Sequence, residues 1–201
     1  MRTFTLYILL TGFSGMLHAQ EETLLKFDGE THGFGGPVAK ITTINGQSAI
    51  LLGGRGGWVF NHRFVIGGGI YTLATEVDAA QDILPAEGPL DVDFSYFGLE
   101  MEYVFQPNVL IHYSLHSLLG VGAVRLLKDV GSFSKENTQV QETNFAFVFE
   151  PTANVELNVA RWCRIMAGAS YRVTTGVTQV GLGNNDFTGL AASLTIKFGS
   201  F

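Results

Sequence analysis

The chain is poor in cysteine and in charged residues. Cys163 is the only cysteine among its 201 residues, which excludes an intrachain disulfide and a metal site with several cysteine ligands. A lone cysteine of this kind is expected to be a small apolar strand residue rather than a nucleophile. Charged residues make up 15% of the chain and the formal net charge is −6. Because no basic stripe is present to neutralise phosphates, a nucleic-acid partner is not expected.

Long apolar runs are confined to the amino-terminal segment. Residues 1–19 are expected to form a signal peptide, with Arg2 as its positive residue and Ala19 at the cleavage point. No later window approaches the roughly 20 apolar residues that a membrane-spanning helix needs. An exported chain without a helical anchor is periplasmic, secreted or an outer-membrane barrel.

Alternation of apolar and polar residues takes the place of long apolar runs. In the stretch 144–159, one parity is apolar and the other carries Asn144, Glu150, Thr152, Asn154, Glu156 and Asn158. Successive side chains of a strand point to opposite faces, so a strand of this kind separates an apolar medium from a polar one. A soluble sandwich covers the apolar face with a second sheet, whereas a membrane barrel turns it to lipid.

Eight such segments are expected to be strands, and helical periodicity is missing after the signal peptide. Their expected ranges are 35–44, 47–60, 63–73, 92–105, 109–124, 144–159, 163–174 and 187–198. An even number suits a closed bacterial barrel. The sequence therefore predicts an all-β fold, a closed antiparallel eight-stranded transmembrane β-barrel in an up-and-down meander, preceded by the cleavable signal peptide. Residues 20–32 are expected to be a short periplasmic extension, and residues 33–201 the barrel.

Connections of two lengths alternate along the chain. Short links are expected at residues 61–62, 106–108 and near 160–161, and long polar loops at 74–91, 127–143 and 175–186. Outer-membrane barrels have short periplasmic turns and longer outer loops, so both termini are expected in the periplasm. The remaining outer link is Asn45-Gly46, a two-residue type I′ hairpin signal.

Turn lengths predict which residues face each other, and paired residues share one face of the sheet. The Asn45-Gly46 turn places Ile41 opposite Ile50, and Ala39 opposite Leu52, on the outside. The other short links place Arg55 opposite Gly68, Glu102 opposite His112 and Glu156 opposite Arg164. Gly68 is expected to leave room for the guanidinium of Arg55.

Large aromatic residues are expected to form two belts where lipid meets water. The belt at the periplasmic strand ends comprises Trp58, Phe60, Tyr103, Phe105, Trp162 and Phe198. The belt at the opposite ends comprises Tyr71, Phe94, Phe145, Tyr171 and Phe187.

The chain resembles the small outer-membrane β-barrels of the outer-membrane protein A, X and W type over residues 33–201. The resemblance lies in the run Gly53 to Trp58, in Gly67-Gly68-Gly69, and in the terminal row Leu190, Ala192, Leu194, Ile196 and Phe198. It implies location in the outer membrane of a Gram-negative bacterium, contact with its lipid, and an assembly signal in the terminal row that the barrel insertion machinery reads. The chain departs from this pattern by adding Gly199-Ser200-Phe201, so either Phe198 or Phe201 is the terminal aromatic.

Charged residues share the inward parity and are expected to form a network in the barrel interior, the lumen. Its members are Lys40, Arg55, Glu100, Glu102, His112, Glu150, Glu156, Arg164, Arg172 and Lys197, with His116 on the same face. Buried ions are costly unless paired, and an eight-stranded interior holds only side chains or one small ligand. The network is therefore expected to plug the lumen. Leu118, Val124, Val148 and Met166 also point inward, which leaves a shallow apolar pocket open toward the outer half.

These features favour a non-enzymatic outer-membrane barrel that acts structurally or in surface recognition through its three long loops. No catalytic, cofactor-binding or metal-binding residue is expected. His112 and His116 stand roughly 13 Å apart along a strand, which is too far for the two to bind one metal ion. A narrow channel or carrier for small molecules is one alternative. An outer-membrane lipid-modifying enzyme is another, although it needs a nucleophile with a base at the outer rim and no histidine falls in an outer loop. A soluble lipocalin-like barrel, with its faces inverted, is the structural rival.

Overall fold

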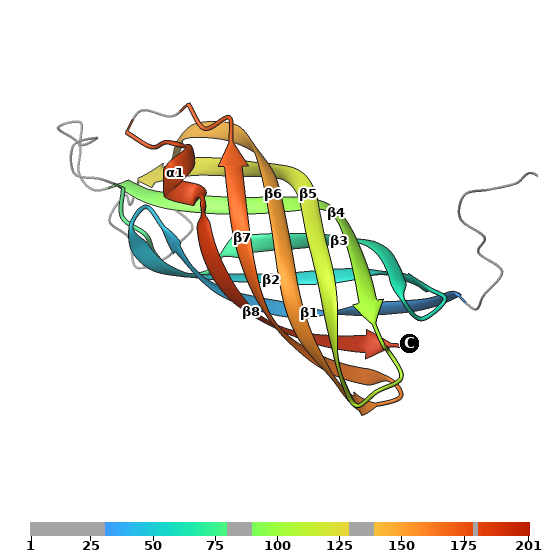
Figure 1. Cartoon of the computed structure of the whole chain (residues 1–201). Helices are drawn as coiled ribbons and strands as arrows, with labels where there is room; N and C mark the ends of the chain where they lie inside the picture. Colours follow the sequence, from blue (N-terminus) through green and yellow to red (C-terminus); the bar gives the residue numbers. More distant parts are fainter. Residues whose placement is uncertain (1–30, 80–89, 129–138, 179–180) are drawn as a thin grey trace, which may run out of the picture.

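The computed structural model describes residues 31–79, 90–128, 139–178 and 181–201, which form one closed antiparallel barrel of eight strands (Figure 1). The elements are β1 (Thr31–Ile44), β2 (Gln47–Phe60), β3 (Phe64–Leu73), β4 (Leu90–Phe105), β5 (Ile111–Lys128), β6 (Gln139–Ala160), β7 (Cys163–Thr175), α1 (Asn184–Phe187) and β8 (Gly189–Gly199). Each strand pairs with its sequence neighbours, and β1 pairs with β8 to close the sheet. The predicted all-β meander is confirmed. The expected signal peptide lies outside the described residues.

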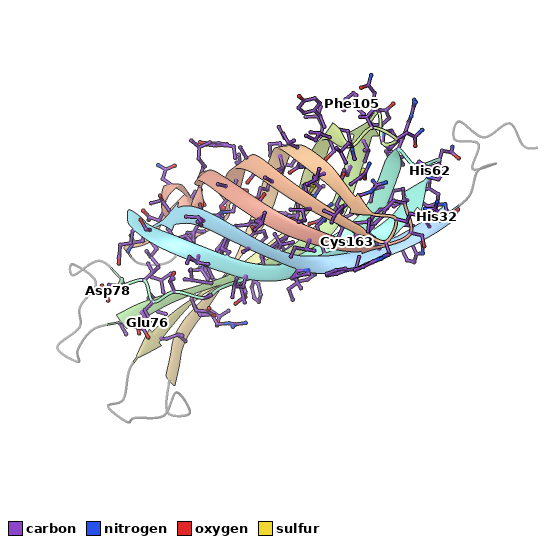
Figure 2. The ribbon with its side chains drawn as sticks, turned by 90° about the horizontal axis from the view of Figure 1, so that it is seen from below. His32, His62, Glu76, Asp78, Phe105 and Cys163 are labelled. Carbon is purple, nitrogen blue, oxygen red and sulfur yellow. The ribbon has the colours of Figure 1, made fainter. Side chains whose placement is uncertain are left out.

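The barrel has two different ends. The short turns after β2, β4 and β6 define the tight-turn end, where β1 begins and β8 ends. The connections after β1, β3, β5 and β7 define the long-loop end, which carries α1 (Figure 1). In Figure 2, His32, His62 and Phe105 lie at the tight-turn end, and Glu76 and Asp78 at the other. Because β1 begins at Thr31, Thr31 and His32 belong to the barrel and not to the expected extension.

Apolar side chains lie on the outside of the barrel and ionised ones on the inside. Phe147 is 67% exposed, Val155 45% and Leu194 52%, whereas Glu102 is 1% and Glu156 0% exposed. This is the reverse of a soluble barrel, whose interior is apolar. The lipocalin-like alternative is therefore wrong.

The hairpin between β1 and β2 has the predicted register. Asn45 and Gly46 both have positive φ angles, 48° and 73°, as a type I′ turn requires. Ile41 pairs with Ile50 and Ala39 with Leu52, which confirms the predicted pairs.

The turn between β2 and β3 is one residue longer than the predicted link. Asn61 and His62 have φ angles of 52° and 58°, and the N–H of Arg63 donates to the carbonyl of Phe60 at 3.1 Å. Phe60 therefore pairs with Phe64, and Arg55 with Gly69 rather than Gly68. A shift of one residue moves every side chain of a strand to the other face. For this reason Tyr71, expected in the outer belt, is buried inside the barrel.

Two further registers differ from the predicted ones without exchanging faces. Between β4 and β5 the turn is longer than three residues, so Glu102 pairs with His116 and not with His112. Between β6 and β7 the register shifts near Asn158, so Glu156 pairs with Met166 and not with Arg164. These shifts are four and two residues, and even shifts keep each side chain on its predicted face.

The aromatic belts are only partly as predicted. Trp58, Tyr103, Phe105, Trp162 and Phe198 are exposed at the tight-turn end, where Phe60 is half-buried. Phe145 and Tyr171 are exposed toward the other end. Tyr71, Phe94 and Phe187 are instead buried in the lumen, Phe94 because it shares the inward parity of Glu100 on β4. Phe187, expected to begin a strand, ends the one-turn helix α1.

The single described helix is far too short and too polar to cross a membrane, and no other helix is found in the described ranges. Its sequence is Asn-Asn-Asp-Phe, and the side chain of Asp186 accepts the N–H of Gly183 at 2.7 Å. One turn is too short to show a helical period, so the sequence pattern did not reveal it.

Glycine allows a close approach of β4 and β5 inside the barrel. Gly98 pairs with Gly120, and a Cβ on Gly98 would lie 2.7 Å from the Cα of Gly120. We predict that Gly98→Ala lowers the free energy of unfolding in detergent by about 1–3 kcal/mol, because the two backbones must move apart. Gly54→Ala is the control: its Cβ would meet its nearest atom at 3.6 Å, and a change within about 0.5 kcal/mol is expected. Equal effects of the two variants would contradict this account of Gly98.

Candidate functional site

The lumen is the candidate site, because four carboxylates and their partners converge in it. Glu100 and Glu102 come from β4, and Glu150 and Glu156 from β6. At alternate positions of these strands their side chains share the inward face. The structure places all ten residues of the expected network inside the barrel, each 7% exposed or less: Lys40, Arg55, Glu100, Glu102, His112, Glu150, Glu156, Arg164, Arg172 and Lys197.

Glu102 has the most partners. One of its oxygens accepts hydrogen bonds from Lys197 Nζ at 2.9 Å and Ser114 Oγ at 2.6 Å. The other accepts from Arg55 Nη2 at 3.1 Å and from Lys197 Nζ at 3.0 Å. Both oxygens are thus satisfied by cations and a hydroxyl, which a buried carboxylate requires. Ser114 was not among the expected site residues, although its inward parity on β5 could have indicated it.

Glu100 joins the same network through Arg55. The Nε of Arg55 lies 2.7 Å from one Glu100 oxygen, and Tyr71 donates its hydroxyl to the other at 2.6 Å. His116 Nε2 lies 3.4 Å from Glu100 Oε2. Gly69 faces this cluster, and a Cβ there would collide with the Glu100 carboxylate. Gly69, not the expected Gly68, pairs with Arg55, and the room that it leaves is taken by the Glu100 carboxylate rather than by the guanidinium.

Glu156 completes the network toward the tight-turn end. Its Oε1 lies 3.2 Å from Lys197 Nζ and 3.9 Å from Arg164 Nη1, and its Oε2 lies 3.1 Å from His112 Nε2. His112 Nδ1 in turn contacts the carbonyl of Val109 at 3.2 Å. Glu156 and Arg164 were expected to be directly opposite each other across β6 and β7. They are instead offset by two residues along the strands and approach each other diagonally.

Glu150 forms a second cluster nearer the long-loop end. It accepts hydrogen bonds from Lys40 Nζ at 2.8 Å, Tyr96 Oη at 2.6 Å and Ser170 Oγ at 2.7 Å. Lys40 Nζ also lies 3.6 Å from the centre of the Tyr71 ring, a cation–π contact. Tyr71 thereby lies between the two clusters.

Aromatic rings fill the lumen from Tyr71 toward the long-loop end. Successive ring centres are 5.0 Å apart from Tyr71 to Tyr96, 5.3 Å from Tyr96 to Phe94, and 5.0 Å from Phe94 to Phe187. We call these four rings the aromatic column. Leu118, Val124, Val148 and Met166 are buried inside the barrel as expected, and all but Met166 belong to the apolar cluster that contains the column. The half of the lumen toward the long-loop end, its outer half in the expected orientation, is therefore filled mainly by apolar side chains, with Arg172 among them.

Phe201 lies at the tight-turn mouth of the lumen. It packs on the small apolar cluster that includes Phe34, with the two ring centres 6.3 Å apart, and its ring centre lies 4.1 Å from the guanidinium carbon of Arg164. Phe198 points outward instead and stacks on Trp162 at 6.1 Å. Phe198, not Phe201, therefore continues the outward row of Leu190, Ala192, Leu194 and Ile196 on β8.

The described residues contain no group of three or more metal-binding side chains. His32 and His62 lie with their ring centres 5.2 Å apart at the tight-turn end, away from Glu76 and Asp78 (Figure 2). Cys163 is buried. What the lumen can do chemically is hold and balance charge and exclude water.

The comparisons with known proteins agree with this geometry. The sequence matches no protein-family model and no curated protein. Among solved structures, Neisserial surface protein A is similar with a TM-score of 0.54 and 14% identity, covering 85% of this chain and 96% of that one. The N-terminal β-barrel domain of Pseudomonas aeruginosa OprF is similar with a TM-score of 0.51 and 11% identity, covering 85% and 98%.

The chain has the fold of the small eight-stranded outer-membrane β-barrels. At these identities the similarity concerns the fold alone. It carries no information about the side chains that fill the lumen.

Buried and exposed ion pairs of equal length provide a matched test of the network. Arg55 Nη2 lies 3.1 Å from Glu102, and Arg125 Nη1 lies 3.1 Å from Asp93, but only the second pair is partly exposed. We predict that Arg55→Gln lowers the free energy of unfolding by about 3–5 kcal/mol, because it leaves buried carboxylates uncompensated. Arg125→Gln should cost less than about 1 kcal/mol. Urea titration of the refolded variants in detergent measures both, and a similar small loss for the two would show that the network adds little.

Proposed function

We propose that this chain is an integral β-barrel of a Gram-negative outer membrane, with its tight-turn end and both termini in the periplasm. It acts structurally or in surface recognition through the connections at its long-loop end. The lumen is closed by side chains and carries out no reaction. The terminal row on β8 is the segment that the barrel insertion machinery reads, with Phe198 as its aromatic residue.

The observation that carries this proposal is the apolar outer wall. Large apolar side chains are exposed on every strand, and those more than half exposed include Ile41, Trp58, Ile70, Phe97, Leu99, Leu119, Phe147 and Leu194. A soluble monomer rarely exposes a continuous apolar surface of more than a few hundred square ångströms. An outer surface of this kind is stable in contact with the acyl chains of a lipid bilayer. A closed barrel also leaves no unpaired strand edge in lipid.

The positions of the histidines argue against a lipid-modifying enzyme. Such chemistry needs a nucleophile activated by a base at the outer rim. His32 and His62 lie at the proposed periplasmic end, and His112 and His116 are buried among glutamates.

The long-loop end is the proposed contact region for an extracellular partner, through loops 74–91, 127–143 and 175–186. In its described part, the carbonyl of Asp78 accepts the side-chain amides of Asn45 and Gln47 at 2.8 and 2.9 Å. The described beginning of the first loop, residues 74–79, is thereby bonded to the β1–β2 hairpin, and these residues together form the proposed contact surface.

A charge on the outer wall tests the membrane location. Leu119 lies in the middle of β5 and is 58% exposed. We predict that Leu119→Arg lowers stability in phosphatidylcholine vesicles by about 2–4 kcal/mol, because the guanidinium must enter the bilayer centre. Asn108→Arg, in the exposed turn after β4, should change it by less than about 0.5 kcal/mol. A soluble barrel would tolerate both, so equal stabilities would contradict the proposal.

Planar-bilayer recording tests the closed lumen against the channel alternative. Because the charge network and the aromatic column fill the interior, we predict that the refolded protein gives no steady conductance above that of the protein-free bilayer. Steady, ion-selective conductance would favour the narrow channel.

A further inference from the structure

Arg172 is a fully buried cation without a counter-charge. Its exposed fraction is 0%, and within the described ranges no carboxylate forms an ion pair with it. Its Nε donates to the carbonyl of Phe187 at 2.7 Å, its Nη2 contacts Thr42 Oγ1 at 3.4 Å, and its Nη1 has no hydrogen-bond partner among the described residues. A buried guanidinium held only by neutral oxygens is unusual, because desolvating its charge is costly.

The other luminal cations differ from Arg172 in this respect. Each of them lies within 4.0 Å of a glutamate: Lys40, Arg55, Arg164 and Lys197. Counting the described lumen, these four and Arg172 make five cations against Glu100, Glu102, Glu150 and Glu156, which leaves one excess positive charge with the histidines neutral. That charge is located in the outer half of the lumen, among apolar side chains.

Aromatic rings form the surroundings of this charge. The guanidinium carbon lies 5.4 Å from the ring centre of Phe94 and 5.9 Å from that of Tyr96. Phe187 packs on Phe94 with the two ring centres 5.0 Å apart. The region thus combines one unpaired cation with a flat aromatic surface, the two features that recognise an aromatic carboxylate.

Phe187 occupies this region in the manner of such a ligand. Its ring contacts Phe94, and its carbonyl oxygen accepts the hydrogen bond of Arg172 Nε. A carbonyl offers a partial charge, whereas a carboxylate would offer a full charge and an acceptor for Nη1 as well. Phe187 belongs to the single turn α1, which is joined to the β1–β2 turn through the bond from Asn45 N–H to the carbonyl of Asp186 at 2.8 Å.

We propose that the outer half of the lumen is a binding site for a small aromatic carboxylate, and that Phe187 occupies this site in the free protein. The ligand's carboxylate accepts a hydrogen bond from Arg172 Nη1, while the backbone carbonyl of residue 187 keeps Nε, and the ligand's ring takes the place of the Phe187 ring on Phe94. This site goes beyond the structural and surface role proposed above, and it uses the interior of the barrel and not its loops.

Isothermal titration of 3-phenylpropionate into the refolded full chain in detergent tests the site. Phe187→Ala empties the ring position, so it should bind the probe at least about tenfold more tightly than the unchanged protein. The neutral alcohol 3-phenylpropanol should bind Phe187→Ala at least about tenfold more weakly than the acid does, because it lacks the charge. Phe147→Ala removes a ring of similar size from the outer wall, and it should leave binding as in the unchanged protein.

Replacing the guanidinium separates the site from nonspecific uptake by detergent. The double variant Phe187→Ala with Arg172→Gln should lose the saturable binding that Phe187→Ala shows. Undiminished binding in the double variant, or no saturable binding in Phe187→Ala, would overturn the proposal. A second readout does not depend on the double variant folding: in Phe187→Ala, the side-chain Nε–H resonance of Arg172 should shift on titration, and an unshifted resonance would also overturn it. Heat-modifiable gel mobility confirms that each barrel is folded, so a failure here is distinguishable from a failure of the membrane proposal.

Discussion

The charge contacts of Glu102 are the interaction on which the rest of the interior depends. Lys197 and Arg55 reach this carboxylate from β8 and β2, which lie in different parts of the closed sheet. A carboxylate buried in a narrow barrel is costly unless cations pair with it. The network therefore determines which parity of β1, β2 and β4 to β8 faces inward, and with it the apolar outer wall.

The lumen is divided into two regions with different physics. Near the tight-turn end, glutamates and cations neutralise one another over short distances. Toward the long-loop end, the packed rings of the aromatic column fill most of the interior. Phe187 of α1 is the ring of the column nearest that end. Tyr71 joins the two regions, because its hydroxyl donates to Glu100 while its ring carries Lys40.

Alternation alone predicted most of this fold, and the errors have identifiable causes. The predicted link at Asn61-His62 has two residues, whereas the turn in the structure has three. The prediction therefore placed Tyr71 on the outer face, although the side chain points inward. A longer turn between β4 and β5 and a register shift near Asn158 between β6 and β7 changed the registers by even numbers, so Glu102 and Glu156 kept their predicted faces while their partners changed. Phe94 was assigned to a belt because of its depth, although its parity already placed it inside. Nothing in the local pattern indicated that Phe187 would turn inward from a single helical turn, since that depends on Phe94 and Arg172 across the lumen.

Spin-label accessibility along β6 tests the inside-out arrangement most directly. Single cysteines, introduced after Cys163→Ser, would carry nitroxide labels at successive positions from Phe145 to Leu157 in lipid bilayers. The account predicts that labels at the odd positions, such as Phe147 and Val155, collide with oxygen dissolved in the acyl chains, while labels at the even positions between them meet neither oxygen nor a water-soluble nickel chelate. Odd positions that meet the nickel chelate and exclude oxygen would contradict the account.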